Sequence, residues 1–183
     1  MQDFSLDWGV SMIRVLVVED EPPILRSICI KIPEINPSFE VVDTACNGRE
    51  AIEKLTARND IDVAVVDINL PVLNGIAVLE CIKENHPNIL SVVLSGYKDY
   101  EYVRAAFGNN TVDYLLKPLK DEQLRAALEK IKATHTENNF HNDTDILGRA
   151  LRGVTRQDEE LNSQQYYMLF ITAGADEHAY PGR

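Results

Sequence analysis

The sequence predicts an α/β fold, a five-stranded and mostly parallel sheet with helices on both faces. Between residues 13 and 134, short apolar runs rich in β-branched residues alternate with segments whose apolar residues recur at helical spacing. Five such strand–helix units in about 120 residues favour a doubly wound parallel sheet. In addition, charged residues directly follow several apolar runs, at the edge where open α/β sheets bind their ligands.

Each predicted strand is a short, mainly apolar run. The strands cover Ile13–Val18, Phe39–Ala45, Asp62–Asp67, Ile89–Leu94 and Val112–Leu116. The third is continuously apolar from Val63 to Val66, which is typical of a strand buried on both faces of a sheet. Because this run ends at Asp67, we expect that carboxylate at the carboxyl edge of the sheet.

Five helices are predicted from apolar residues spaced three and four apart. They cover Pro22–Ile32, Arg49–Ala57, a segment that begins at Asn74-Gly75 and ends before Pro87, Lys98–Phe107 and Lys120–Ala133. Prolines are tolerated in the first turn of the first helix, and we expect Pro33 to end it. The fifth helix has one apolar face, formed by Leu124, Ala127, Leu128 and Ile131.

The strand–helix pattern covers only part of the chain. Residues 1–12 are unpatterned, and we interpret them as a leader or extension. Residues 135–145 are polar and rich in Asn and Asp, which indicates a linker. Residues 146–183 contain the rest of a possible helix over Asp145–Val154 and a possible strand over Tyr166–Thr172. One helix and one strand cannot bury a core alone, so we interpret 146–183 as the start of an incomplete second domain.

Composition limits the possible functions. The net charge is −11, from 18 basic and 29 acidic residues, so this chain alone is a poor candidate for binding DNA or anionic lipid. No apolar run approaches the ~20 residues of a membrane span and no secretory signal is present, so we expect a cytoplasmic protein. The three cysteines are widely spaced and are expected to be small buried residues in a reducing compartment. The four histidines lack metal-ligand spacing.

Three strand ends carry matching chemistry. Glu19 and Asp20 follow the first strand, Asp67 ends the third, and Lys117 follows the fifth. Carboxylates suit Mg²⁺, and a metal with a lysine can neutralise a phosphoryl group. Asp67 would be the nucleophile, Glu19 and Asp20 would hold Mg²⁺ directly or through water, and Lys117 would pair with Asp67 and then with the phosphate. Taken singly, an acid after a strand is often only a helix cap and a Lys-Pro pair only a loop; the combination favours a site.

Five motifs carry a family resemblance. They are Val-Val-Glu-Asp-Glu (17–21), Val-Val-Asp-Ile-Asn-Leu-Pro (65–71), Asn-Gly (74–75), Leu-Ser-Gly-Tyr (94–97) and Tyr-Leu-Leu-Lys-Pro (114–118). In this order and spacing, residues 13–134 resemble the receiver domain of bacterial two-component response regulators. The resemblance implies a flavodoxin-like fold with strand order 2-1-3-4-5 and phosphotransfer from a sensor histidine kinase to Asp67. It also implies the backbone carbonyl of Asn69 as a further Mg²⁺ ligand and a cis bond before Pro118.

The resemblance implies that Ser95 and Tyr114 form a switch pair. A hydroxyl at residue 95, with Gly96 beside it leaving room, can move to bond a phosphoryl oxygen on Asp67. Tyr114 can then turn inward into the vacated space, which changes the surface near the fourth helix. Without the acids, Ser95 would be interpreted as a turn residue and Tyr114 as a half-buried strand aromatic. One departure from the family is the acid pair, which is Glu-Asp rather than Asp-Asp, so Glu19 is one methylene longer than usual.

The output and partners are also inferred from resemblance. Residues 94–107 resemble receivers of the YesN-type subgroup, whose members usually end in an AraC-type helix-turn-helix domain. The chain would then be truncated after the receiver, and transcription regulation through DNA would belong to the full-length protein only. The kinase is expected to dock on the first helix around Ile24 and Ile28. A homodimer is expected through the face formed by the fourth and fifth helices, whose mixed charges could equally form an ordinary solvated face.

Three other classes of protein share some of these features. A haloacid-dehalogenase-like phosphatase also uses a nucleophilic Asp after a strand, but it needs a second Asp two residues on, where this chain has Asn69. We therefore expect no turnover enzyme, only catalysis of the domain's own phosphotransfer and dephosphorylation. A scaffold without phosphorylation would be expected to lack Asp67, an acid or Lys117. A stand-alone phosphorelay receiver that acts through protein–protein contacts remains the open alternative.

Overall fold

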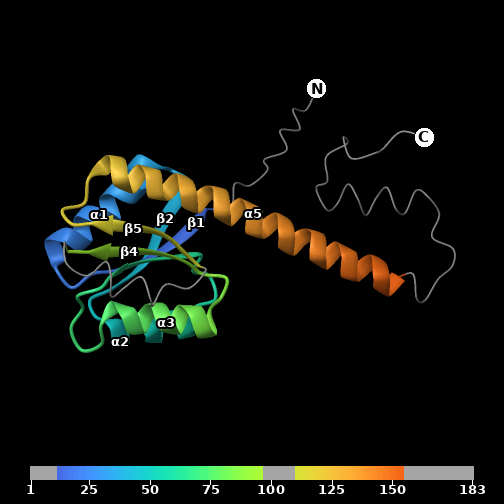
Figure 1. The fold of residues 1–183 in the computed structure, drawn as a ribbon, viewed down its shortest axis with the longest axis horizontal. Coiled ribbons are helices and arrows are strands. Elements are labelled where there is room, and N and C mark those ends of the chain that lie inside the picture. The colour runs from blue at the N-terminus through green and yellow to red at the C-terminus, as the bar shows by residue number, and fades with distance from the viewer. Residues whose placement is uncertain (1–11, 97–109, 155–183) are drawn as a thin grey trace, which may run out of the picture. The chain divides into compact units, whose positions relative to one another are not determined.

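The computed structural model describes residues 12–96 and 110–154, and for residues 139–154 it describes the backbone alone. Five parallel strands form one sheet in the order β2-β1-β3-β4-β5 (Figure 1). The strands are β1 Ile13–Val18, β2 Phe39–Ala45, β3 Val63–Asp67, β4 Leu90–Ser95 and β5 Thr111–Leu116. The predicted fold class and strand order are therefore confirmed, and the strand bounds differ from prediction by one residue at most.

Helices cover both faces of the sheet (Figure 1). The described helices are α1 Pro22–Ile35, α2 Gly48–Ala57, α3 Gly75–Asn85 and α5 Asp121–Val154. Side chains of α1 and α5 pack into the core on one face, and side chains of α2 and α3 pack into the core on the other. The predicted fourth helix, Lys98–Phe107, lies outside the described residues.

The two cores explain the sequence pattern of the central strands. Successive side chains of a strand point to opposite faces. In β3, Val63 and Val65 belong to the α1/α5 core, whereas Ala64 and Val66 belong to the α2/α3 core. All five residues of β3 are buried, Asp67 included. The continuous apolar run of this strand thus reflects burial on both faces, and it carries a carboxylate into the interior.

Helix α1 does not end at Pro33 as predicted. It continues through Pro33 to Ile35, and Asn36 then donates its backbone N–H to the carbonyl of Ile32 at 3.0 Å. Proline removes one helical hydrogen bond, but Pro33 lies at the exposed surface while Ile28 and Ile32 are fully buried. Burial of the apolar face near the end of the helix outweighs the one lost hydrogen bond.

The fifth helix does not end at Ala133 as predicted, because α5 runs unbroken from Asp121 to Val154. No Gly or Pro occurs between residues 135 and 147, and Asn or Asp costs only about 0.5 kcal/mol each relative to good helix formers. The predicted helix over 145–154 is the end of α5. The chain divides into two compact units, Met1–Thr134 and His135–Arg183. The roles of 135–145 as a linker and 146–183 as a second domain remain predictions, and the strand Tyr166–Thr172 lies outside the described residues.

Two smaller findings concern the surface. Burial was predicted for all three cysteines, but Cys29 and Cys81 are only half-buried and Cys46 is exposed. Cys46 lies just before Asn47, the N-cap of α2, and donates its backbone N–H to the side chain of Glu50 at 2.9 Å. The start of α2 therefore holds Cys46 at the surface.

Within the part of the chain that the structure describes, no helix is long and apolar enough to cross a bilayer.

Candidate functional site

The strand register brings the sequence-predicted residues to one edge of the sheet. Val18 of β1 pairs with Val66 of β3, so Glu19 and Asp67 come next to each other along neighbouring strands. Asp67 pairs in turn with Leu94 of β4, the residue before Ser95. Lys117 donates its backbone N–H to the carbonyl of Ser95 at 2.8 Å. Residues far apart in sequence thus meet because all five strands are parallel and end together.

Lys117 bridges two buried carboxylates. Its Nζ donates a hydrogen bond to Asp67 Oδ2 at 2.7 Å and lies 2.7 Å from Glu19 Oε2. The side chain of Glu19 is 0% exposed and that of Asp67 is 3% exposed. Sequence reasoning predicted the pairing with Asp67 but missed the contact with Glu19. The sequence offered one clue to this contact, because Glu19 has one methylene more than an Asp.

Burial and charge act against each other here. Burial raises the pKa of Glu19 above its ordinary value, and the nearby Lys117 only partly offsets this. Burial also pulls the pKa of Lys117 down, but its contacts with Asp67 and Glu19 outweigh that effect and raise the pKa overall. The ammonium is therefore held charged between two acids that have little access to water.

The acids have the composition of a divalent-metal site. Glu19, Asp20 and Asp67 each offer a carboxylate oxygen, and these oxygens lie within 4.8 Å of one another. Asp20 is half-buried, so one side of the group is open to solvent. Apart from Lys117, Glu19 Oε2 has no hydrogen-bonding partner among residues 12–96 and 110–138. Hard oxygen ligands with one buried oxygen lacking an aligned hydrogen bond fit Mg²⁺.

The turn after β3 holds Asp67 in place. The N–H of Asn69 lies 3.2 Å from Asp67 Oδ1, and the N–H of Gly75 bonds the carbonyl of Ile68 at 3.0 Å. A Cβ at residue 75 would come 1.9 Å from the Asp67 carbonyl oxygen, so only glycine lets α3 begin here. Val72 in the same turn has φ 67°, a strained conformation for a β-branched residue, and nothing in the sequence predicted it. The metal-binding role of the Asn69 carbonyl remains a prediction.

Ser95 and Tyr114 lie on neighbouring strands and on the same face of the sheet. Tyr114 pairs with Val93, two residues before Ser95, and packs against the α2/α3 core. Ser95 is fully buried, and its Oγ donates a hydrogen bond to the carbonyl of Gly96 at 2.9 Å. Among the described residues, a Cβ added at Gly96 would meet no atom within 4 Å. The switch role of Ser95 and Tyr114 remains a prediction.

A groove opens next to Lys117, between α1 and the loop that joins β5 to α5. Its volume is about 240 Å³. It is lined mainly by apolar side chains, including Pro23, Ile24 and Ile28 of α1 and Pro118 and Leu119 of the loop. The Lys117–Pro118 peptide bond is cis, as the family resemblance implied. The groove therefore borders Lys117, the residue that contacts both buried acids.

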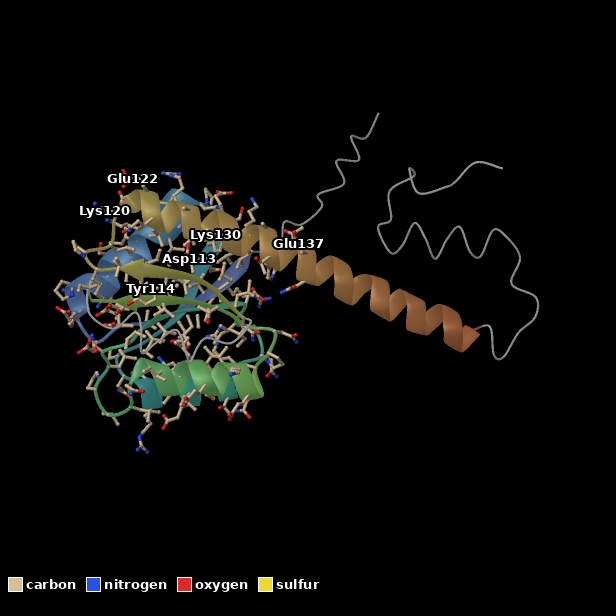
Figure 2. The ribbon with its side chains drawn as sticks, in the orientation of Figure 1. Asp113, Tyr114, Lys120, Glu122, Lys130 and Glu137 are labelled. Atoms are coloured by element: carbon tan, nitrogen blue, oxygen red, sulfur yellow. The ribbon has the colours of Figure 1, made fainter. Side chains whose placement is uncertain are left out.

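The outer side of β5 carries charge. Asp113 and Tyr114 are neighbours on β5, and Lys130 reaches from α5 to Asp113 with Nζ and Oδ2 2.7 Å apart (Figure 2). The homodimer was predicted on a different set of residues, on the fourth helix and on α5, where Asp121 and Arg125 belong to it. The fourth-helix part of that face lies outside the described residues, so the dimer remains a prediction.

Comparison with known proteins identifies relatives of the chain. Residues 15–129 match the model of the response regulator receiver domain. The chain is 34% identical over 126 residues to a probable C4-dicarboxylate response regulator, DctR, of Bacillus subtilis, an alignment that covers 65% of this chain and 52% of DctR. It is 28% identical over 166 residues to the transcriptional regulatory protein HptR of Staphylococcus aureus, which covers 91% of this chain and 63% of HptR. The chain thus spans between half and two thirds of the length of these curated relatives.

Solved structures agree with the fold. A response regulator receiver domain protein from Clostridium thermocellum superposes with a TM-score of 0.61 at 28% identity, over 70% of this chain and 98% of that one. The REC domain of AraT, a response regulator from Geobacillus stearothermophilus, gives a TM-score of 0.60 at 32% identity, over 69% of this chain and 99% of that one. Each superposition covers nearly the whole solved chain.

Proposed function

The chain belongs to the family of response regulator receiver domains, and on that premise we propose that it accepts a phosphoryl group on Asp67 from a sensor histidine kinase. The observation that carries this proposal is the position of Asp67, buried at the end of β3, hydrogen-bonded to Lys117 and grouped with Glu19 and Asp20. Such a carboxylate is held in one orientation for attack on a phosphoryl group.

The proposed phosphotransfer is a displacement at phosphorus by Asp67. A carboxylate oxygen of Asp67 attacks phosphorus, the P–N bond to the kinase histidine breaks, and an acyl phosphate remains on Asp67. The Lys117 ammonium then donates to a phosphoryl oxygen instead of the free carboxylate. A bound Mg²⁺, held by Glu19, Asp20, Asp67 and the Asn69 carbonyl, would neutralise the phosphoryl oxygens. The domain thereby catalyses only its own phosphotransfer and dephosphorylation.

The proposed response begins at Ser95. Its hydroxyl donates to the neighbouring Gly96 carbonyl, and it would turn to donate to a phosphoryl oxygen on Asp67. Tyr114, on the same face of the sheet, would follow into the space that Ser95 leaves. The added phosphoryl charge would thus favour one of two surface conformations over the other. A receiver would change its partners in this way.

Partners follow from the surfaces next to the site. We propose that the kinase docks in the groove beside α1, which includes Ile24 and Ile28 and borders Lys117. We further propose a cytoplasmic protein that dimerises through the face formed by the fourth helix and α5. The relatives carry names of transcriptional regulators, which favours a transcriptional output over a stand-alone phosphorelay receiver. DNA binding would belong to an output domain and not to the residues of this chain, whose net charge is −11.

The phosphoacceptor can be tested with the full chain, Mg²⁺ and acetyl phosphate, read by intact mass. The wild type should gain the mass of one phosphoryl group, and Asp67→Asn should gain none. Asp121→Asn is a matched control, because Asp121 is exposed and its carboxylate pairs with Lys31 rather than with Lys117; it should label like the wild type. Equal labelling of Asp67→Asn and the wild type would refute the proposal.

A further inference from the structure

The acids of the site are already engaged. Asp67 Oδ2 is bonded to Lys117 and Oδ1 to the N–H of Asn69. Glu19 Oε1 lies 3.3 Å from the N–H of Glu21, and Oε2 lies 2.7 Å from the Lys117 ammonium. Every oxygen of the two buried carboxylates therefore has a neighbour that a metal ion must displace or share.

The Lys117 ammonium lies 2.7 Å from both acids, but the alignment of the two contacts differs. The Lys117 ammonium is aligned for a hydrogen bond with Asp67 but not with Glu19, where only the ion-pair distance is short. A cation held by Glu19 Oε2 would lie close to the ammonium, and like charges repel strongly where water is excluded. The contact between Lys117 and Glu19 is the one that should break.

We propose that Lys117 is a built-in competitor of the divalent cation, so that the Glu19–Lys117 contact sets how tightly this receiver binds metal. The inference rests on the metal site of the proposed function and adds an order of events. Metal binding frees Lys117 from Glu19, and the ammonium is then available to a phosphoryl oxygen on Asp67. Glu19 is one methylene longer than Asp, and its Oε2 lies 2.7 Å from the Lys117 ammonium.

The test is Mg²⁺ binding to the full chain without any phosphoryl donor, measured by titration calorimetry and by the metal-induced rise in Tm. Lys117→Met should lower the Kd for Mg²⁺ by about tenfold, because the competing charge is gone. Lys120→Met is the matched control: Lys120 is exposed and three residues away, and its loss changes the net charge equally. It should alter the Kd by less than about twofold, since exposed charges are screened.

Two further variants keep the test decisive. Lys117→Gln should show the same tightening, so the result does not depend on one variant folding well. In a Glu19→Gln background, Lys117→Met should give a clearly smaller gain, because the contact under test is already removed. A Kd in Lys117→Met and Lys117→Gln equal to or higher than that of the wild type would overturn the inference.

The two proposals fail in different ways. If the wild type is labelled on Asp67 while the Lys117 variants bind Mg²⁺ no tighter, only the competition is refuted. If the wild type neither binds Mg²⁺ nor becomes labelled, the proposed function fails and the competition with it.

Discussion

Among the described residues, two lysines each contact two carboxylates, at nearly the same distances. The buried cluster consists of Glu19, Asp67 and Lys117, with both contacts at 2.7 Å. The second place, the α2 network, lies on β2 and α2, where Lys54 contacts Asp43 and Glu50 at 2.9 Å each. The two clusters differ in access to water rather than in geometry.

This difference reverses the effect on the acids. In the buried cluster, burial raises the pKa of Glu19 despite the adjacent ammonium. In the α2 network, the hydrogen bond from Lys54 lowers the pKa of Asp43, and the backbone N–H of Cys46 lowers the pKa of Glu50. Desolvation thus dominates in one place and pairing in the other. The buried cluster therefore lowers stability while it holds acids available for a metal ion, whereas the α2 network stabilises the fold modestly.

The largest expected contrast is between the two lysines. Lys117→Met leaves two buried carboxylates without a cation and should lower the free energy of unfolding by about 2–3 kcal/mol in Mg²⁺-free buffer. Lys54→Met removes a half-exposed partner and should cost about 0.5–1 kcal/mol. Urea denaturation of both variants provides the measurement. Equal losses would mean that burial does not distinguish the clusters.

Replacing one acid in each place should give effects of opposite sign. Glu19→Gln removes a charge that the interior disfavours and should raise the free energy of unfolding by about 1 kcal/mol at neutral pH without metal. Asp43→Asn removes a favourably paired charge and should lower it by about 0.5 kcal/mol. Both values come from the same urea titrations. A destabilised Glu19→Gln would show that its pairing with Lys117 outweighs its burial.

The smallest effect is the pH dependence of the changes in unfolding free energy that Glu19→Gln and Asp43→Asn cause. Asp43 has a lowered pKa, so its stabilisation is present above the ordinary value of 3.8 and is lost as the pH falls through the folded-state pKa. Glu19 has a raised pKa, so its cost is present at neutral pH and is gone once the pH falls below the ordinary value of 4.5.

Both differences should therefore shrink toward zero as the pH falls from about 7 to about 3, and the change for Glu19→Gln should begin at the higher pH. The measurement is urea unfolding of the wild type and both variants at a series of pH values. Differences that stay constant across this range would mean that the two acids do not titrate as their surroundings require.

Much of the fold could be predicted because strands and helices leave local periodic patterns. The continuous apolar run before Asp67 predicted a strand buried on both faces, and β3 is such a strand. The errors came where burial or continuity overrode a local signal. Pro33 lies inside α1 because Ile28 and Ile32 are buried beside it, and the polar residues 135–145 stay helical because no strong breaker interrupts them.

The sequence by itself determined which chemical groups the protein has and, through the order of parallel strands, that Glu19, Asp67 and Lys117 would meet at one edge of the sheet. Only the tertiary structure decided that Glu19 is fully buried and shares the ammonium of Lys117 with Asp67. The physical reason is that a strand pattern depends on neighbouring residues, whereas desolvation depends on every element packed around a group.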